Sequence, residues 1–101
     1  MIIYNITTQV AHSISELWLA WMKEKHLPEI MEKGCFSKYQ FVKLLETDES
    51  DGVTYAVQFY APDRQAYEHY LKAYAPSLRE DAFSSWGDKM ISFRSLMESI
   101  D

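Results

Sequence analysis

The sequence predicts one α+β domain whose elements follow the order βαββαβ. Four segments alternate between apolar and polar residues, as strands with one buried face do. Two segments between them repeat apolar residues at helical spacing, and each contains a proline and ends at a glycine, so the two halves of the chain resemble each other. The 101 residues, 48% hydrophobic and 25% charged, suit a single folded domain with its own core.

The first strand is predicted over residues 2–10, where β-branched and aromatic side chains alternate with polar ones. A helix follows, with Ser13 as its N-cap and Glu16 completing a capping box. Its apolar stripe consists of Ile14, Leu17, Trp18, Trp21 and Met22. Lys25 falls in the middle of this stripe, so either its ammonium extends to solvent or the helix changes phase there; Pro28 favours the phase change.

The middle of the chain predicts two strands joined by an acidic turn. Gly34 ends the first helical segment, and a strand is expected over residues 36–46. Asp51-Gly52 is a hairpin signal, and the third strand is expected over residues 53–60.

A second helical segment, a second glycine and a last strand complete the pattern. Asp63 is expected to cap the helix, Pro76 to break or kink it, and Gly87 to end it before a strand over residues 89–98. Its apolar stripe consists of Tyr67, Tyr70, Leu71, Tyr74 and Leu78.

Helical connections between strands are right-handed, which places both kinked helices on one face of a four-stranded antiparallel sheet. The ferredoxin-like split βαβ arrangement is the simplest solution. The side chains expected on the helix-covered face are Tyr4, Ile6, Val10, Tyr55, Val57, Phe59, Ile91 and Phe93.

The opposite face of the sheet is expected to mix polar and apolar residues. Its members are Asn5, Thr7, Gln9, Gln58, Tyr60 and Arg94, together with Ile3, Ala56 and Leu96. Such a face is either solvated or packed against the same face of a second copy, and the mixture favours a homodimer. Asn5, Gln58 and Arg94 would form a polar cluster at that dimer face, with Glu98 or Glu46 as the partner of Arg94.

Several segments have a distinctive spacing: Met1-Ile-Ile-Tyr-Asn5, Trp18-x-x-Trp21-Met22-x-x-x-His26-x-Pro28, Gly34-Cys35-Phe36, Asp51-Gly52-x-x-Tyr55, Ala75-Pro76-x-Leu78-Arg79-Glu80 and Phe93-Arg94. Together they resemble an uncharacterised family of short bacterial proteins, a domain of unknown function. The resemblance implies a dimeric α/β barrel, a superfamily that includes antibiotic-biosynthesis monooxygenases and EthD-like proteins. It implies no particular reaction, since that superfamily hosts many chemistries.

His26 is the candidate acid–base group, because histidine titrates near neutral pH. The competing interpretation is that it complements the partial negative charge at the helix C-terminus. His12 and His69 are expected at the surface, and Cys35 is expected to be a small buried hydrophobe.

The aromatic stripes predict either an ordinary core or a small-ligand pocket between helices and sheet. The expected pocket residues, beside His26, are Trp18, Trp21, Tyr55, Tyr67 and Tyr70. Three functions remain open: a ligand-binding protein, a cofactor-independent monooxygenase or isomerase acting on a phenolic or quinone-like substrate, and a structural dimer with a filled core.

Charge and motif content exclude other classes. A net charge of −5 and the lack of a basic cluster count against nucleic acid and anionic membrane as partners. No metal or cofactor motif is present, so none is expected. A single cysteine and no signal sequence favour a cytoplasmic protein.

Overall fold

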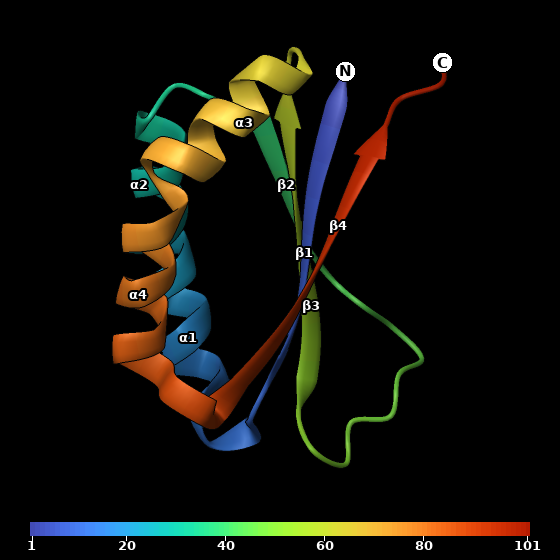
Figure 1. Cartoon of the computed structure of the whole chain (residues 1–101). Helices are drawn as coiled ribbons and strands as arrows, with labels where there is room; N and C mark the ends of the chain where they lie inside the picture. Colours follow the sequence, from blue (N-terminus) through green and yellow to red (C-terminus); the bar gives the residue numbers. More distant parts are fainter.

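The computed structural model describes all residues, 1–101, and contains one four-stranded antiparallel sheet in the order β2-β3-β1-β4. The strands are β1 (Ile2–Val10), β2 (Lys38–Lys43), β3 (Val53–Ala61) and β4 (Met90–Glu98). The helices all lie against one face of this sheet, and the other face is open (Figure 1). The predicted ferredoxin-like α+β fold is confirmed.

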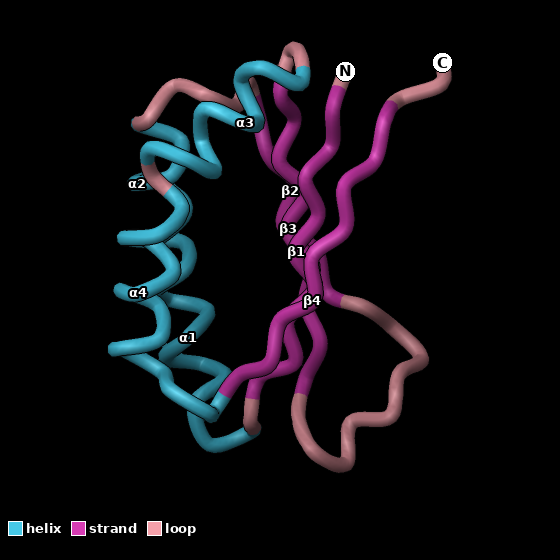
Figure 2. The backbone as a smooth tube through the Cα atoms, viewed as in Figure 1, coloured by secondary structure: helices cyan, strands magenta, loops and turns pink.

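The helical layer has two segments, each interrupted once. Its helices are α1 (Ser15–Trp21), α2 (Leu27–Glu32), α3 (Arg64–Ala73) and α4 (Ala75–Trp86). The 3₁₀ turns η1 (His12–Ile14) and η3 (Gly87–Lys89) lie at the same end of this layer, where it joins β1 and β4 (Figure 1). Figure 2 shows the helices on one side of the strands and the long β2–β3 loop on the other.

The first helical segment changes phase as predicted, through a π-helical turn. This turn, η2 (Met22–His26), joins α1 to α2, and Pro28 lies in the first turn of α2. A π turn adds one residue to the helical repeat, so the residues after it face a new direction. Lys25 therefore leaves the apolar stripe and lies half-exposed between two acidic side chains.

The helix caps match the sequence only in part. Ser13 does not cap α1, because the chain enters that helix through the 3₁₀ turn η1 and no side chain bonds its first amides. Asp63 does cap α3, since its carboxylate accepts a hydrogen bond of 2.8 Å from the Ala66 N–H. Gly34 and Gly87 both have positive φ, as expected of residues that follow a helix end.

The predicted tight turn at Asp51-Gly52 is instead the end of a longer loop, residues 44–52. β2 ends early, at Lys43, and Glu46 takes a positive φ of 58° that is incompatible with a strand. Gly52 packs on the carbonyl oxygen of Val10, where any Cβ would overlap with that oxygen. Close approach to β1, more than turn geometry, therefore explains a glycine at this position.

The register of β4 corrects the predicted sheet faces. Ile6 pairs with both Val57 and Arg94, so Arg94 lies on the helix-covered face together with Leu96. Ile91 and Phe93 lie on the open face, where they are 57% and 68% exposed. The predictions for these four residues are wrong, because alternation shows that a strand has two unlike faces without showing which one meets the helices.

The core lies between the helices and the three strands β2, β3 and β1. Its largest fully buried side chains are Trp18, Phe59, Leu27, Ile30 and Val10. Cys35 belongs to this core, as predicted, and burial raises the pKa of its thiol. Neither edge strand contributes a fully buried residue, and Phe41 of β2 and Met90 of β4 are only partly buried against the core.

Candidate functional site

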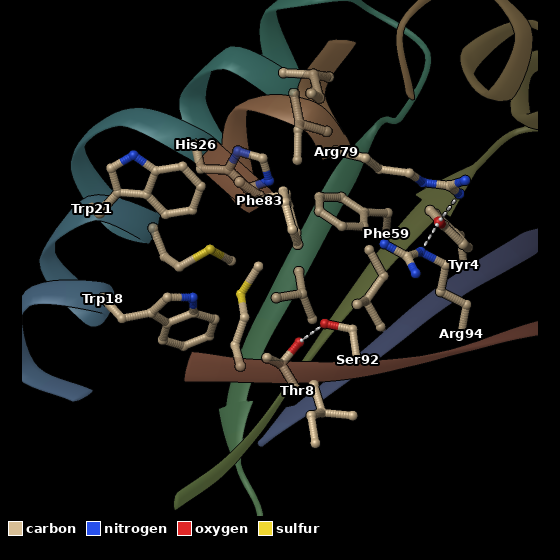
Figure 3. A pocket seen from close by; sticks show the side chains of 18 of the residues that line it. Tyr4, Thr8, Trp18, Trp21, His26, Phe59, Arg79, Phe83, Ser92 and Arg94 are labelled. Carbon is tan, nitrogen blue, oxygen red and sulfur yellow. Dashed lines mark hydrogen bonds between the residues drawn. The ribbon is translucent and has the colours of Figure 1, made fainter. Parts of the chain in front are cut away.

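A cavity of about 470 Å³ lies between the helix layer and the sheet. The residues that line it come from all four α-helices, with only Tyr70 from α3, and from β1, β3 and β4. Two thirds of these residues are hydrophobic. The residues labelled in Figure 3 are Tyr4, Thr8, Trp18, Trp21, His26, Phe59, Arg79, Phe83, Ser92 and Arg94. The cavity therefore has apolar walls with a small number of polar groups.

The predicted pocket residues divide into two groups. Trp18, Trp21 and Tyr70 line the cavity, as does His26. Tyr55 and Tyr67 lie on the helix-covered side but outside the lining. Tyr55 packs against the Trp18 ring, with centroids 5.3 Å apart, and Tyr67 packs against Tyr4 at 5.2 Å. Both tyrosines thus support lining residues from behind.

His26 lies in the π turn and stacks on Trp21, with ring centroids 4.4 Å apart and an interplanar angle of 17°. Its Nδ1 is buried and has no hydrogen-bond partner. Burial lowers the pKa of His26 from 6.5 to about 4, although the nearby carboxylates of Asp81 and Glu29 act in the opposite direction. The imidazole is therefore neutral at neutral pH, which argues against the interpretation that it complements a helix end as a cation.

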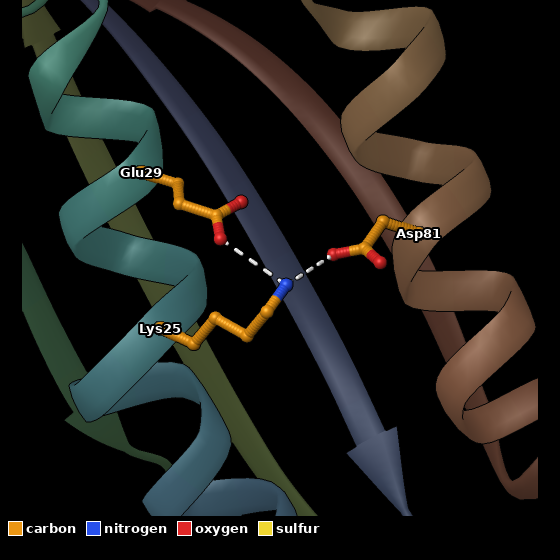
Figure 4. Close-up of polar contacts among 3 residues, drawn as sticks. All are labelled: Lys25, Glu29 and Asp81. Carbon is orange, nitrogen blue, oxygen red and sulfur yellow. Dashed lines mark hydrogen bonds and ion pairs between the residues drawn. The ribbon is translucent and has the colours of Figure 1, made fainter.

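An ion-pair cluster joins the two helical segments beside His26. The Lys25 ammonium lies 2.9 Å from Asp81 on α4 and 3.1 Å from Glu29 on α2 (Figure 4). These hydrogen bonds raise the pKa of Lys25, so the side chain stays charged. All three side chains are partly exposed, so the cluster links the two helical segments but contributes little to stability.

The polar wall of the cavity is built on β1 and β4. The Tyr4 hydroxyl accepts hydrogen bonds from Arg79 Nη2 at 2.9 Å and from Arg94 Nε at 3.1 Å. Beside it, the hydroxyls of Thr8 and Ser92 are hydrogen-bonded at 2.9 Å. Neither Glu98 nor Glu46 forms an ion pair with Arg94, so the predicted acidic partner is wrong.

The predicted polar cluster of the open face is only partly assembled. Asn5 and Gln58 are opposite each other in the β1–β3 ladder and face away from the helices, whereas Arg94 lies on the other side of the sheet. Asn5 donates to Thr7, and Gln58 accepts from Tyr60. His12 and His69 are exposed, as predicted.

Two findings bear on ligand classes. No group of three or more His, Cys, Asp or Glu side chains is placed to hold a metal ion. None of the helices combines the length and the apolar character that a membrane crossing needs.

Comparison with known families gives one match that spans almost the whole chain. Residues 1–100 match the family described as a domain of unknown function, DUF4286. The chain belongs to this family. A comparison with curated protein sequences gives no match.

Solved structures resemble this DUF4286 domain in fold over its whole length. An EthD-family protein of Bacillus halodurans superposes with a TM-score of 0.74 at 10% identity, covering 99% of this chain and 100% of its own. A dimeric ferredoxin-like protein from an uncultured marine organism gives 0.76 at 10% identity, covering 99% and 95%. SnoaB, a cofactor-independent oxygenase of Streptomyces nogalater, gives 0.68 at 13% identity, covering 99% and 93%. At these identities the likeness extends to the fold alone.

Sequence reasoning missed several lining residues of the DUF4286 domain. Arg79 and Phe83 lie on α4, outside the apolar stripe that was read from Tyr67 to Leu78 across the helix break at Tyr74. Tyr4 is expected on the helix-covered face, but nothing in its neighbours along the chain indicates that its hydroxyl bonds two arginines from distant segments. The alternation of Ser92 and Arg94 with Ile91 and Phe93 shows two unlike faces of this strand, but no local signal shows that the polar face borders the cavity.

The low pKa of His26 predicts a stability loss in acid. The unfolded chain binds a proton at His26 more tightly than the folded one, so this contribution is complete above about pH 6.5 and is lost as the pH falls toward 4. We expect protonation of His26 to lower the free energy of unfolding by roughly 2–3 kcal/mol between pH 7 and pH 4. Urea denaturation at both pH values measures the decrease in the free energy of unfolding. In the His26→Gln variant we expect this decrease to be smaller by the same roughly 2–3 kcal/mol. The exposed His69→Gln is the matched control, and a His26→Gln variant that keeps the wild-type pH dependence would contradict the assignment.

Proposed function

We propose that this domain binds a small, largely aromatic molecule in the cavity between its helices and its sheet. The observation that carries the proposal is the cavity itself, since protein cores normally pack without voids of this size. Its volume of about 470 Å³ falls within the range of small-molecule sites, roughly 300–1,000 Å³. A purely structural dimer is expected to have a filled core, without such a cavity.

The chemistry of the walls supports an aromatic occupant. Trp21 and Phe83 line the cavity and are not fully buried, so their rings offer surface that favours flat apolar molecules. The hydroxyls of Thr8 and Ser92 and the guanidinium groups provide the few polar contacts that fix an orientation. Of the four buried polar side-chain atoms without a hydrogen-bond partner, Trp18 Nε1 and His26 Nδ1 belong to residues that line the cavity.

Filling the cavity tests the proposal. Ala82 on α4 is buried and lines the cavity, so the indole of Ala82→Trp would occupy the space of a ligand. We expect calorimetric titration with 2-naphthamide, a neutral two-ring probe, to show binding to the wild type and at least a tenfold weaker affinity in this variant. Ala73→Trp, at an exposed position of α3 outside the lining, is the matched control and should bind like the wild type. Equal binding by all three proteins would place the probe outside the cavity.

A cofactor-independent monooxygenase is the second candidate function. His26 lines the cavity as a neutral imidazole, which is the form that accepts a proton from a phenol. SnoaB, which shares the fold, is a cofactor-independent oxygenase. A pKa of about 4 nevertheless makes His26 a weak base, since proton transfer is most effective when the pKa lies near the working pH. For this reason the binding function ranks first.

Turnover of a phenolic probe separates the two candidates. In the oxygenase reaction 1-naphthol and O₂ would give 1,4-naphthoquinone and water, with His26 accepting the phenol proton. If this reaction occurs, His26→Ala should lower its rate about 10²–10⁴-fold, while His69→Ala should leave it unchanged. Absorbance of the quinone reports the rate. Quinone formation at the rate of a protein-free control would eliminate the oxygenase and leave the binding function.

We also propose that the domain forms a homodimer through its open sheet face. Ile91 and Phe93 lie there on β4 with 57% and 68% of their surfaces exposed, next to each other on one face of the strand. Contiguous exposed apolar side chains on a sheet face are typical of interaction surfaces. One of the proteins with this fold is itself described as dimeric. A twofold arrangement would pair the face with itself, so that each copy covers the other.

A single charge on this face is predicted to separate the dimer. Phe93→Glu places a carboxylate where the second copy would pack, and because Phe93 is 68% exposed the fold of one chain should tolerate it. Light scattering should give twice the chain mass of 11.9 kDa for the wild type and the chain mass for the variant. Leu17→Glu on α1, also at a 68% exposed position, is the matched control and should remain dimeric. A wild type that is monomeric at micromolar concentration would refute the homodimer.

A further inference from the structure

Two arginines converge on the cavity wall without an acidic partner. Arg79 extends from α4 and Arg94 from β4, and both donate to the Tyr4 hydroxyl, at 2.9 and 3.1 Å. Figure 3 shows the two guanidinium groups meeting at this oxygen from opposite sides. The four ion pairs of the structure involve neither of them.

The lack of an acidic partner does not reflect a shortage of acidic residues. The sequence has 15 Asp and Glu against 10 Lys and Arg, so carboxylates are available throughout the molecule. Two like charges held against one neutral oxygen repel each other, and a phenol offsets that repulsion far less than an anion does. Both arginines are partly exposed to solvent at the cavity mouth, so their attraction for an anion is screened by salt.

Tyr4 itself adds a third donor. Its oxygen accepts both arginine hydrogen bonds, and its own hydroxyl proton has no acceptor in the structure. A phenolic hydroxyl can donate once and accept twice, so the unused proton remains available to a ligand oxygen. Three donors from three elements, α4, β4 and β1, thus surround one point on the cavity wall.

We infer that the cavity takes an aromatic carboxylate, whose carboxylate group binds Arg79, Arg94 and Tyr4 while its rings lie against the apolar lining. The inference rests on the proposed binding function and names its ligand class. Flat guanidinium groups match the two oxygens of a carboxylate. Apart from His26 and Asp88, the remaining lining residues are apolar or carry neutral hydroxyls. A matching ligand therefore has its anionic group at one end of an apolar ring system.

A matched pair of probes tests this ligand class. 2-Naphthoate and 2-naphthamide have the same shape and differ in charge, so calorimetric titration of both at pH 7.5 isolates the contribution of the carboxylate. We expect the wild type to bind the naphthoate at least about tenfold more tightly, in keeping with charge-assisted hydrogen bonds. Added salt should reduce this preference.

Substitutions then assign the preference to the two arginines. The double variant Arg79→Gln/Arg94→Gln keeps a hydrogen-bond donor at each position and should bind both probes alike. Arg64→Gln is the matched control, because Arg64 is an exposed arginine of α3 that pairs with Glu68 away from the cavity. Should the double variant fail to fold, Arg79→Gln alone, at an exposed helix position, should still lose part of the preference.

The outcomes distinguish the inference from the proposed function. Equal affinities of the wild type for the two probes would overturn the carboxylate inference and leave the aromatic binding site standing. A preference that persists in the arginine variants would also overturn it. Absence of binding by either probe would overturn the proposed function and with it this inference.

Discussion

The register between β1 and β4 is the constraint on which the site depends. It places Arg94 opposite Ile6 and Ser92 opposite Thr8, so that the polar residues of β4 face the helices. A slip of one residue would reverse every side chain of β4, moving Phe93 into the cavity and both polar groups onto the open face. Because β4 is an edge strand that pairs only with β1, this single ladder determines the chemistry of the cavity wall and of the outer surface together.

The cavity exists because the helix layer fits one half of the sheet better than the other. Aromatic packing among Phe36, Phe59 and Tyr70 fills the space over β3 and β1. Over β4 the helix α4 presents Ala82 and the exposed Phe83, and the strand presents Ser92 and Arg94, none of which fills the gap. The Lys25 cluster bridges α4 and α2, where the two helical segments meet beside the cavity.

The sequence indicated the fold well because its signals are local. Strict alternation over residues 2–10 defines β1, and Asp63, Gly34 and Gly87 act through their own backbone geometry. The cavity is harder to predict from the sequence, because it depends on where the helix layer and the sheet do not contact each other. Tyr55 on β3 and Tyr67 on α3 both lie between the helices and the sheet, yet whether a ring lines a void or supports another ring depends on its neighbours from other elements. The pairing of Arg79 with Tyr4 spans 75 residues and has no local signature.

The two proposed interaction surfaces are linked through β4. Successive side chains of a strand point to opposite faces, so Phe93 and Arg94 project from adjacent backbone positions, one toward a second copy and the other toward the cavity. A partner that covers Phe93 would restrict the motion of an edge strand that one chain holds by a single ladder. The same restriction would hold Arg94 in place against Tyr4. Assembly of the dimer would therefore pre-organise the anion-binding wall, and a bound carboxylate would in turn stabilise the strand that forms the interface.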